Sequence, residues 1–257
     1  MQYVSLFGAG NMGGSMAANL LANGWTVEVC DIDPARVQSL VSKGALALSS
    51  PAQAAIYSVA FIVCVVDATQ TDAVLFGPEG LARMLQPGHT VMLCPTMAPQ
   101  DVECFASRLA ALGVHAVDAP MSGGPARARD GSMSLMVACP AAVHAQLAKL
   151  LQALSNKVFR ISERPGDGAR TKLVNNLLAG INLVGAAEVL ALAGRLGLDP
   201  SRTLDVIEQS SGQSWIGSDR MRRAIAGDYA PRAHVTLLEK DTRLAVEAAR
   251  AAGFEGP

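Results

Sequence analysis

The sequence predicts an α/β chain: a Rossmann-type parallel-sheet domain over residues 1–161, followed by an all-α helical domain over residues 162–257. Three observations support this prediction. The apolar run 3–7 leads directly into a glycine-rich turn and then a helical pattern. Apolar runs and helical patterns then alternate up to about residue 160, which is typical of a parallel sheet covered on both faces. Beyond Pro165 and Gly166 only helical patterns remain.

Each element is expected from its own run of residues. Strands are predicted where short β-branched or apolar runs occur, over 3–7, 25–30, 59–66, 90–94, 114–118 and 133–138. Helices are predicted where apolar residues have helical spacing, over 12–23, 81–85, 99–112 and 141–154 in the first domain. In the second domain they are predicted over 168–196, 200–209, 216–226 and 235–252.

The glycine-rich turn is Gly8-Ala-Gly10-Asn-Met-Gly13. A strand that runs into G-x-G-x-x-G and then into a helix opens a dinucleotide-binding fold. Gly8 permits the tight turn, Gly10 lets the backbone approach a pyrophosphate, and Gly13 lets the helix pack close to the strand. Asn11 and Met12 lie at the helix N-terminus, whose unpaired N–H groups attract phosphate. We therefore expect these residues to bind the cofactor.

Asp31 ends the second strand, where an acidic side chain can accept a hydrogen bond from the adenosine ribose 2′-hydroxyl. Ile32 and Asp33 follow, so no arginine is expected there to pair with a 2′-phosphate, and a carboxylate would repel one. The sequence thus favours NAD, with NADP less favoured. The alternative is that Asp31 caps the helix that begins at Pro34, a role for which Asp33 is better placed.

The composition excludes several classes of function. Half of the 257 residues are hydrophobic, 17% are charged and the net charge is −1, so neither nucleic acid nor an anionic membrane is an expected partner. No signal peptide is recognisable, and the five cysteines contain no C-x-x-C pair, which predicts a reducing, cytoplasmic location. The four histidines have no ligand spacing, so no metal site is expected.

The helical pattern over 168–196 is long and apolar. Residues 177–194 are about long enough to span a membrane. However, they include Asn182 and Glu188, are rich in alanine and glycine, and have no aromatic belt. We therefore expect a buried helix in a soluble protein. Its apolar faces also suggest burial against a partner subunit, in a homo-oligomer that is a dimer or a tetramer.

Lys172 is the candidate catalytic residue. A helix that is apolar on nearly every face is buried, so an ammonium near its start is partly desolvated. Desolvation lowers a lysine pKa from about 10.4 toward roughly 7–8, where the amine can act as a general acid or base. Asn176 lies one turn later on the same face and can orient a hydroxyl; Asn175 adjoins it. The alternative is a lysine whose ammonium simply reaches solvent.

A second polar group follows the strand that ends at Asp118. Ser122, Gly123 and Gly124 offer bare backbone N–H groups and one hydroxyl. Such a nest binds a carboxylate. A plain turn has the same composition and is the alternative.

Four motifs in this order resemble the β-hydroxyacid dehydrogenases, the family that includes 3-hydroxyisobutyrate dehydrogenase and tartronate semialdehyde reductase. They are Gly8-x-Gly10-x-x-Gly13, Asp118-Ala-Pro-Met-Ser122-Gly-Gly124, Gly168-x-x-x-Lys172-Leu-Val-Asn-Asn176 and Lys240-Asp241. The resemblance covers nearly the whole chain. It implies oxidation of a small hydroxy acid by hydride transfer to NAD, within the 6-phosphogluconate dehydrogenase superfamily.

The resemblance also implies roles for individual residues. In the family, the lysine that matches Lys172 is catalytic, and the asparagine that matches Asn176 helps to hold the substrate. The residues that match Ser122, Gly123 and Gly124 bind the substrate carboxylate. Further substrate contacts are expected from Asn175, Trp215 and Arg220, and further cofactor contacts from Val66, Asp67, Thr96 and Lys240.

Three runs are most similar to the L-threonate dehydrogenase branch, which oxidises four-carbon sugar acids. They are 65–70, 211–215 with Arg220, and 228–232. A sugar acid such as L-threonate is therefore the expected substrate. Activity of the 3-hydroxyisobutyrate dehydrogenase or tartronate semialdehyde reductase type is the alternative.

The sequence departs from the family at three places. Leu93-Cys94-Pro95-Thr96 replaces an acidic-Ser-Thr run, so the backbone around the nicotinamide is expected to differ. Asp67 stands where Asn or Pro is usual, and would disfavour further negative charge near the cofactor. The chain stops at Pro257 where relatives continue for about another helix, so the helical domain is expected to be incomplete.

Three rival functions differ at identifiable residues. A 6-phosphogluconate dehydrogenase would be far longer and would have His-Asn in place of Asn175-Asn176. Imine reductases share the architecture but lack the lysine. A non-catalytic NAD-binding regulatory protein would keep the glycine turn but need not keep Ser122, Lys172 and Asn176 together. Their joint presence favours the enzyme.

Overall fold

The computed structural model describes residues 2–230 and 235–255. The chain divides into two compact units, residues 1–172 and 173–257. This division lies within one long helix, whereas the sequence places the domain boundary at 161/162.

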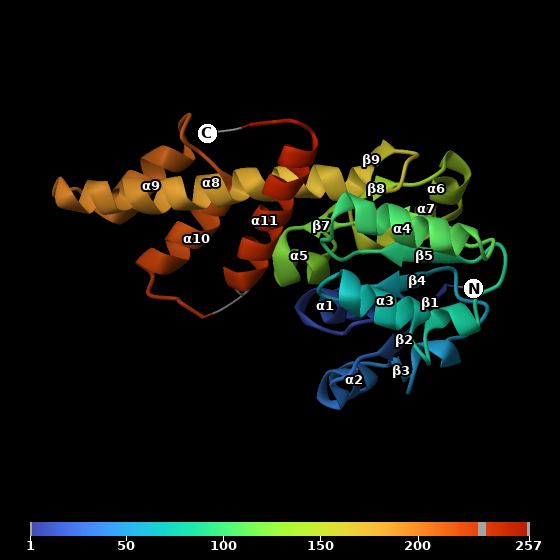
Figure 1. Ribbon diagram of the computed structural model, residues 1–257. Coiled ribbons are helices and arrows are strands. Elements are labelled where there is room, and N and C mark those ends of the chain that lie inside the picture. Colours follow the sequence, from blue (N-terminus) through green and yellow to red (C-terminus); the bar gives the residue numbers. More distant parts are fainter. Residues whose placement is uncertain (1, 231–234, 256–257) are drawn as a thin grey trace. The chain divides into compact units, whose positions relative to one another are not determined.

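The first unit is built on a single sheet, which has nine strands in the described part of the chain (Figure 1). The order is β3-β2-β1-β4-β5-β6-β8-β7, with β9 beside β8. Strands β1 to β6 are parallel, whereas β8 runs antiparallel to β6 and β7 and parallel to β9. The strands are β1 (Tyr3–Phe7), β2 (Thr26–Cys30), β3 (Leu46–Ala47), β4 (Phe61–Val63), β5 (Thr90–Leu93), β6 (His115–Asp118), β7 (Met121–Ser122), β8 (Ser134–Ala138) and β9 (Lys157–Ser162).

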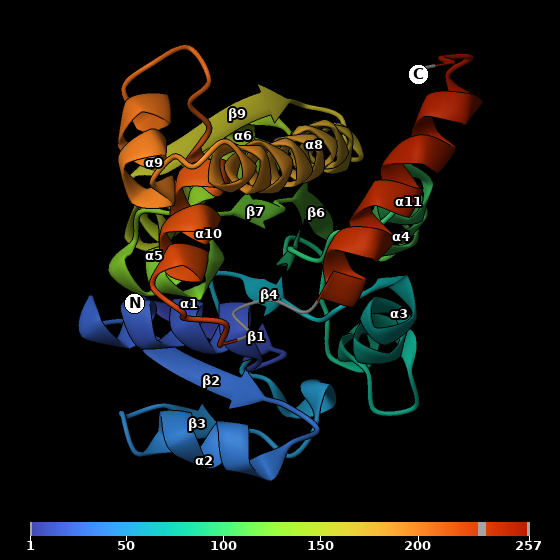
Figure 2. The same cartoon turned by 90° about the vertical axis from the view of Figure 1, so that its left-hand side faces the viewer.

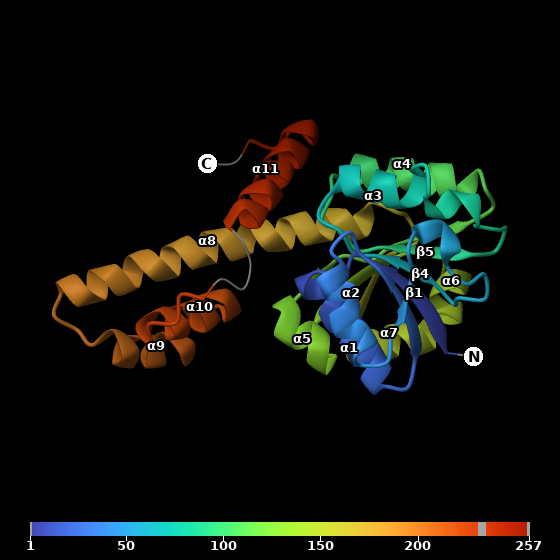
Figure 3. The same ribbon diagram turned by 90° about the horizontal axis from the view of Figure 1, so that it is seen from below.

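Helices cover both faces of this sheet because its strands are apolar on both sides (Figure 2 and Figure 3). In β4, Ile62 packs into one apolar cluster, whereas Phe61 and Val63 pack into the other. The first cluster includes side chains of α1 (Asn11–Ala22), α2 (Pro34–Val41), α5 (Gly124–Asp130), α6 (Ala141–Gln146) and α7 (Ala148–Leu154). The second includes side chains of α3 (Ala68–Phe76) and α4 (Pro99–Ala110). The predicted fold class is therefore confirmed.

Several elements differ from their predicted extent. The helix expected over 141–154 breaks at Leu147, which ends α6 and begins α7. The helix expected over 81–85 is only a 3₁₀ turn, Leu81–Arg83. The strand expected over 59–66 shortens to β4, because its last residues turn toward α3, which Asp67 caps. The two-residue strands β3 and β7 are too short to produce a sequence pattern.

The second unit is helical in the described residues. It contains most of α8 (Asp167–Arg195), and then α9 (Pro200–Glu208), α10 (Trp215–Ile225) and α11 (Val235–Ala251). Helices α9 and α10 lie side by side (Figure 3), joined by Arg222, which donates hydrogen bonds to Asp205 and Glu208. Side chains cap both helices, since Asp199 accepts from Arg202 N–H and Ser214 accepts from Gly217 N–H.

The prediction that α8 is buried is wrong for the single chain. Helix α8 is long and apolar enough to cross a membrane, yet only 11% of its most apolar stretch is buried. Val174, Leu178, Ile181 and Val184 are between 57% and 71% exposed. Apolar periodicity shows that a surface is suited to burial, but it does not show which part of the chain, or which other chain, covers that surface.

Candidate active site

The glycine-rich turn between β1 and α1 shows which glycines the fold itself requires. Gly8 has φ +95°, and a Cβ there would lie 2.4 Å from the carbonyl oxygen of Cys64. A Cβ on Gly13 would lie 1.9 Å from the carbonyl oxygen of Gly8. Gly10 is different, because the nearest atom to its Cβ position is Arg36 Nη1 at 3.8 Å. Since no neighbouring atom of the chain excludes a side chain at Gly10, the open space there fits the close approach of a pyrophosphate.

Asp31 holds this turn in place. Its Oδ2 accepts a hydrogen bond from Ala9 N–H at 2.6 Å, and its Oδ1 accepts one from Asp33 N–H at 2.8 Å. The alternative role as a helix cap belongs to Asp33, which accepts from Ala35 N–H at 3.0 Å. The residues that follow Asp31 in the sequence predict no arginine beside it, but Arg36 Nη1 lies 3.8 Å from its Oδ1.

The other candidate cofactor residues follow β4 and β5 on the same edge of the sheet. The carboxyl ends of β1, β4 and β5 share this edge because the strands are parallel. After β4, Val66 donates its N–H to Gln70 Oε1 at 3.1 Å, and Asp67 accepts from Gln70 N–H at 2.9 Å as the cap of α3. After β5 comes Thr96, which is half-buried. The strand order changes direction between β1 and β4, the usual place for a ligand in such sheets.

Ser122 ends β7, which comes after the carboxyl end of β6 along the chain, and Gly123 and Gly124 follow it. Gly123 and Gly124 have φ of +130° and +75°, a region that side chains rarely adopt. A Cβ on Gly123 would also lie 2.8 Å from Arg127 Cδ. The backbone therefore needs both glycines in this conformation, whether or not the segment binds an anion.

Asp118, at the end of β6, has a structural role that its position in the sequence did not reveal. Its buried Oδ2 accepts hydrogen bonds from Gly166 N–H at 2.8 Å and Ala169 N–H at 3.0 Å. A Cβ on Gly168 would lie 2.9 Å from the carboxyl group, which explains the glycine four residues before Lys172. Burial raises the pKa of Asp118 to about 6, although the backbone hydrogen bonds oppose this shift. Asp118 thus fixes the start of α8 to the sheet.

Lys172 lies one turn beyond this anchored start. It belongs to the first unit and is only 7% exposed. The prediction that this ammonium is removed from bulk water therefore agrees with its burial, although most of α8 is exposed. Asn176 follows four residues later along the same helix, on the same face.

In the second unit, α8 and α11 are joined by a polar network. Asn176 Nδ2 donates to Asp241 Oδ2 at 2.6 Å, and Asn175 Nδ2 donates to Asn176 Oδ1 at 3.0 Å. Lys240 Nζ lies 3.2 Å from Asp241 Oδ1. The buried Asp241 therefore fixes two candidate side chains. The adjacent pair Lys240-Asp241 was the sequence signal for it, but its partner on α8 is distant along the chain.

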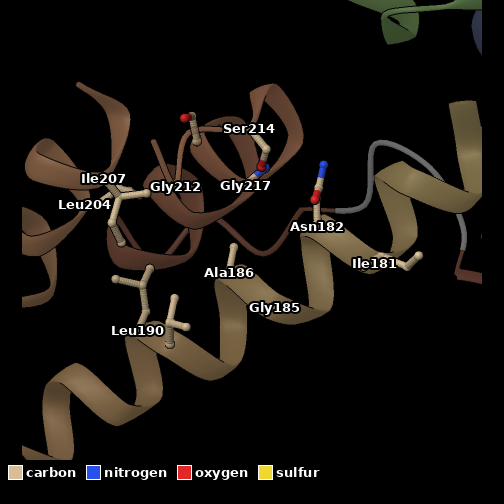
Figure 4. Close-up of a pocket in the computed structure, with 12 residues that line it drawn as sticks. Ile181, Asn182, Gly185, Ala186, Leu190, Leu204, Ile207, Gly212, Ser214 and Gly217 are labelled. Carbon is tan, nitrogen blue, oxygen red and sulfur yellow. The ribbon is translucent and has the colours of Figure 1, made fainter. Parts of the chain in front are cut away.

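Trp215 does not line the pocket that the second unit contains between three of its helices. Trp215 begins α10 and is partly exposed, and Arg220 on the same helix pairs with Asp219 at 2.8 Å. A pocket of about 490 Å³ lies between α8, α9 and α10 (Figure 4). Figure 4 labels Asn182, Ser214 and apolar side chains around it, and none of its lining residues is ionisable. This pocket therefore lacks a group for proton transfer.

The described residues contain no cluster of three or more His, Cys, Asp or Glu side chains that could hold a metal ion. Pro231 and Arg232, which ended one of the sequence runs resembling the L-threonate branch, lie outside the described residues.

Comparison with known proteins gives matches along the whole chain. Residues 3–162 match the NAD binding domain of 6-phosphogluconate dehydrogenase. Residues 166–257 match the NAD-binding domain of NADP-dependent 3-hydroxyisobutyrate dehydrogenase. L-threonate dehydrogenase of Cupriavidus necator is 37% identical over 99% of this chain and 86% of that protein. The chain belongs to the 3-hydroxyisobutyrate dehydrogenase-like family.

Further relatives in the 3-hydroxyisobutyrate dehydrogenase-like family agree. The 3-hydroxyisobutyrate dehydrogenase of Pseudomonas aeruginosa is 34% identical over 100% of this chain and 88% of that protein. A crystal structure of 3-hydroxyisobutyrate dehydrogenase from Salmonella typhimurium has a TM-score of 0.91 at 35% identity, covering 100% of this chain and 90% of the other. Psf3 in complex with NADP⁺ has a TM-score of 0.90 at 27% identity, covering 95% and 86%.

These matches confirm the predicted family and its L-threonate branch. The chain is an NAD-binding dehydrogenase, and its first unit is the NAD-binding domain. The curated relatives are dehydrogenases or reductases, so the non-catalytic alternative has no support.

Proposed function

We propose that this dehydrogenase oxidises the hydroxyl of a small hydroxy acid, a sugar acid such as L-threonate, with Lys172 as general acid and base. The observation that carries the proposal is the position of Lys172. This buried amine lies one turn beyond a helix start that Asp118 fixes to the carboxyl edge of the sheet.

Cofactor binding is assigned to residues along that edge. Gly8, Gly10, Asn11, Met12 and Gly13 form the turn and helix start that hold the pyrophosphate, and Asp31 lies at the adenosine end. Val66, Asp67 and Thr96 lie after β4 and β5, toward the nicotinamide. Lys240 of the second unit completes the set by family resemblance. NAD, when bound, supplies the acceptor for the hydride.

Substrate binding is assigned to the segment after β6 and to polar residues of the helical unit. Backbone N–H groups of Gly123 and Gly124, with the Ser122 hydroxyl, hold the substrate carboxylate. Asn175, Asn176 and Trp215 position the rest of the molecule, and Asp241 keeps the Asn176 amide oriented. In oxidation, Lys172 Nζ takes the hydroxyl proton; in reduction it returns that proton.

The choice of substrate rests on the relatives. Several curated relatives at 35–37% identity are L-threonate dehydrogenases. Others are a 3-hydroxyisobutyrate dehydrogenase and a 2-hydroxy-3-oxopropionate reductase (tartronate semialdehyde reductase). A carboxylate nest accepts all of these acids, so the sugar acid is favoured by the closer relationship of the chain to the L-threonate branch.

A panel of acids tests this proposal. NADH formation would be followed at mildly alkaline pH with L-threonate, D-erythronate, D-glycerate, 3-hydroxyisobutyrate and 3-hydroxypropionate, with NAD or NADP. We expect turnover with NAD and L-threonate to exceed that with the other acids. Faster turnover of 3-hydroxyisobutyrate would replace the substrate assignment but keep the reaction. Binding of NADH without turnover of any acid would contradict the proposed reaction.

We also propose a functional division at 161/162, a homo-oligomer and a cytoplasmic location. The oligomer is supported by the exposed apolar side chains of α8, which suit burial against a second subunit. The composition and the dehydrogenase family support the location.

A further inference from the structure

Arg36 lies beside the glycine-rich turn, in the first turn of α2. Its Nη1 is 3.8 Å from Asp31 Oδ1, and its Nε is 3.2 Å from Asp33 Oδ2. Nη1 is also the nearest atom, at 3.8 Å, to the position that a Cβ on Gly10 would occupy. Two carboxylates therefore hold this guanidinium at the place where the space above the glycines adjoins the end of β2.

The two partners differ in exposure, and this determines which charge faces a ligand. The Asp31 side chain is 5% exposed, and each of its oxygens already accepts a backbone N–H. The Arg36 side chain is 53% exposed. The Asp31 carboxylate, which should repel a 2′-phosphate, thus points into the glycine-rich turn and is paired with a cation. The guanidinium of Arg36 is the charge that faces solvent.

A guanidinium in this position suits a phosphate. It presents several N–H donors in a planar fork that matches phosphate oxygens, and charge-assisted hydrogen bonds of this kind are stronger than neutral ones. In a dinucleotide-binding fold the adenosine ribose lies at the end of β2, and an arginine near that point accommodates a 2′-phosphate.

We propose that Arg36 is a specificity-determining residue: it contacts the 2′ position of the adenosine ribose and allows the NAD-preferring site to accept NADP as well. The inference deepens the proposed function, since it assumes that the glycine-rich turn binds a dinucleotide. The acidic Asp31 alone predicts that NADP is disfavoured; the nearby Arg36 changes the charge that a 2′-phosphate would meet.

Dinucleotide binding, measured without turnover, tests the proposal. NADH and NADPH would be titrated, by their fluorescence, into the wild type, Arg36→Ala, Arg36→Lys and a control, Arg160→Ala. Arg160 suits the control because its side chain is similarly exposed, at 45%, and pairs with Glu163 at the same i,i+3 spacing. It lies on β9, which pairs with β8, whereas β2 is near the opposite end of the strand order. We expect Arg36→Ala to weaken NADPH binding about tenfold or more and NADH binding less than about threefold. Arg36→Lys should be intermediate for NADPH, and Arg160→Ala should match the wild type.

Three results would overturn the inference. Equal weakening of NADH and NADPH would mean that Arg36 supports the turn or the shared pyrophosphate. Tight NADH binding with no detectable NADPH binding by the wild type would mean that Arg36 does not admit the 2′-phosphate. Failure of the wild type to bind either dinucleotide would reject the cofactor assignment itself, a result distinct from the first two.

Discussion

Replacing Asp118 tests whether the start of α8 is held by a single buried carboxylate. Its Oδ2 accepts two backbone N–H groups, from Gly166 and Ala169. Leaving a buried donor without an acceptor costs about 1–3 kcal/mol. Asp118→Ala should therefore lower the free energy of unfolding by about 2–6 kcal/mol. At pH 4, where Asp118 is protonated in the folded protein, Asp118→Asn keeps one acceptor oxygen of nearly the same shape and should cost roughly 1 kcal/mol.

The effect on catalysis follows from Lys172, which lies one turn beyond the two bonded N–H groups. If the helix start moves by about 1 Å, turnover should fall on the order of a hundredfold. Asp118→Ala should therefore lower kcat much more than Asp118→Asn does, with NADH binding nearly unchanged. Equal kcat for the wild type and Asp118→Ala would refute the positioning role.

The pH dependence of stability gives an independent check. Burial raises the pKa of Asp118 from 3.8 to about 6, so the folded protein binds more protons than the unfolded chain between these values. This contribution to stability is present below about pH 4 and is lost as pH rises through 6. Each pKa unit corresponds to about 1.4 kcal/mol, so the loss is about 3 kcal/mol. Urea unfolding between pH 4 and 7 should show this loss in the wild type but not in Asp118→Asn. Parallel curves for the two proteins would contradict the reasoning.

Two further predictions use matched pairs of variants. The free energy of unfolding of Gly10→Ala should lie within about 0.5 kcal/mol of the wild-type value, because the chain leaves room for its Cβ. The variant should bind NADH at least about tenfold more weakly, because the Cβ would occupy space that the pyrophosphate needs. Gly13→Ala should lose about 3 kcal/mol in urea unfolding, because its Cβ would meet the Gly8 carbonyl. Equal stability of the two variants would contradict this. Losses of kcat/KM should be non-additive in a double-mutant cycle of Asn176→Ala and Asp241→Ala, with a coupling of about 1–2 kcal/mol, because the two side chains are hydrogen-bonded. Additive losses would show that the two side chains act separately.

Local features of the sequence predicted much of the fold. The strand Tyr3–Phe7 has its predicted bounds, and α8 begins one residue before its predicted start. These elements depend on runs of neighbouring residues, which the sequence displays directly. The break between α6 and α7 at Leu147 was missed because the apolar spacing continues across it.

The parts of the candidate site that the sequence did not predict depend on contacts between residues that are distant along the chain. Asp118 meets α8 across the sheet edge, Asp241 meets Asn176 from another helix, and Arg36 turns back toward Asp31 and Gly10. Each of these side chains was visible in the sequence, but its partner was not. The exposure of α8 was missed for a related reason, since an apolar pattern does not specify what covers it.

The most direct test of the central claim is turnover by Lys172→Ala and Lys172→Arg, measured together with NADH binding. The acid used would be the one that the wild type oxidises best. If the buried Lys172 amine transfers the hydroxyl proton, both variants should lose turnover by about a hundredfold or more while binding NADH nearly as the wild type does. Turnover near that of the wild type in either variant would show that another group transfers the proton, and would contradict the assignment.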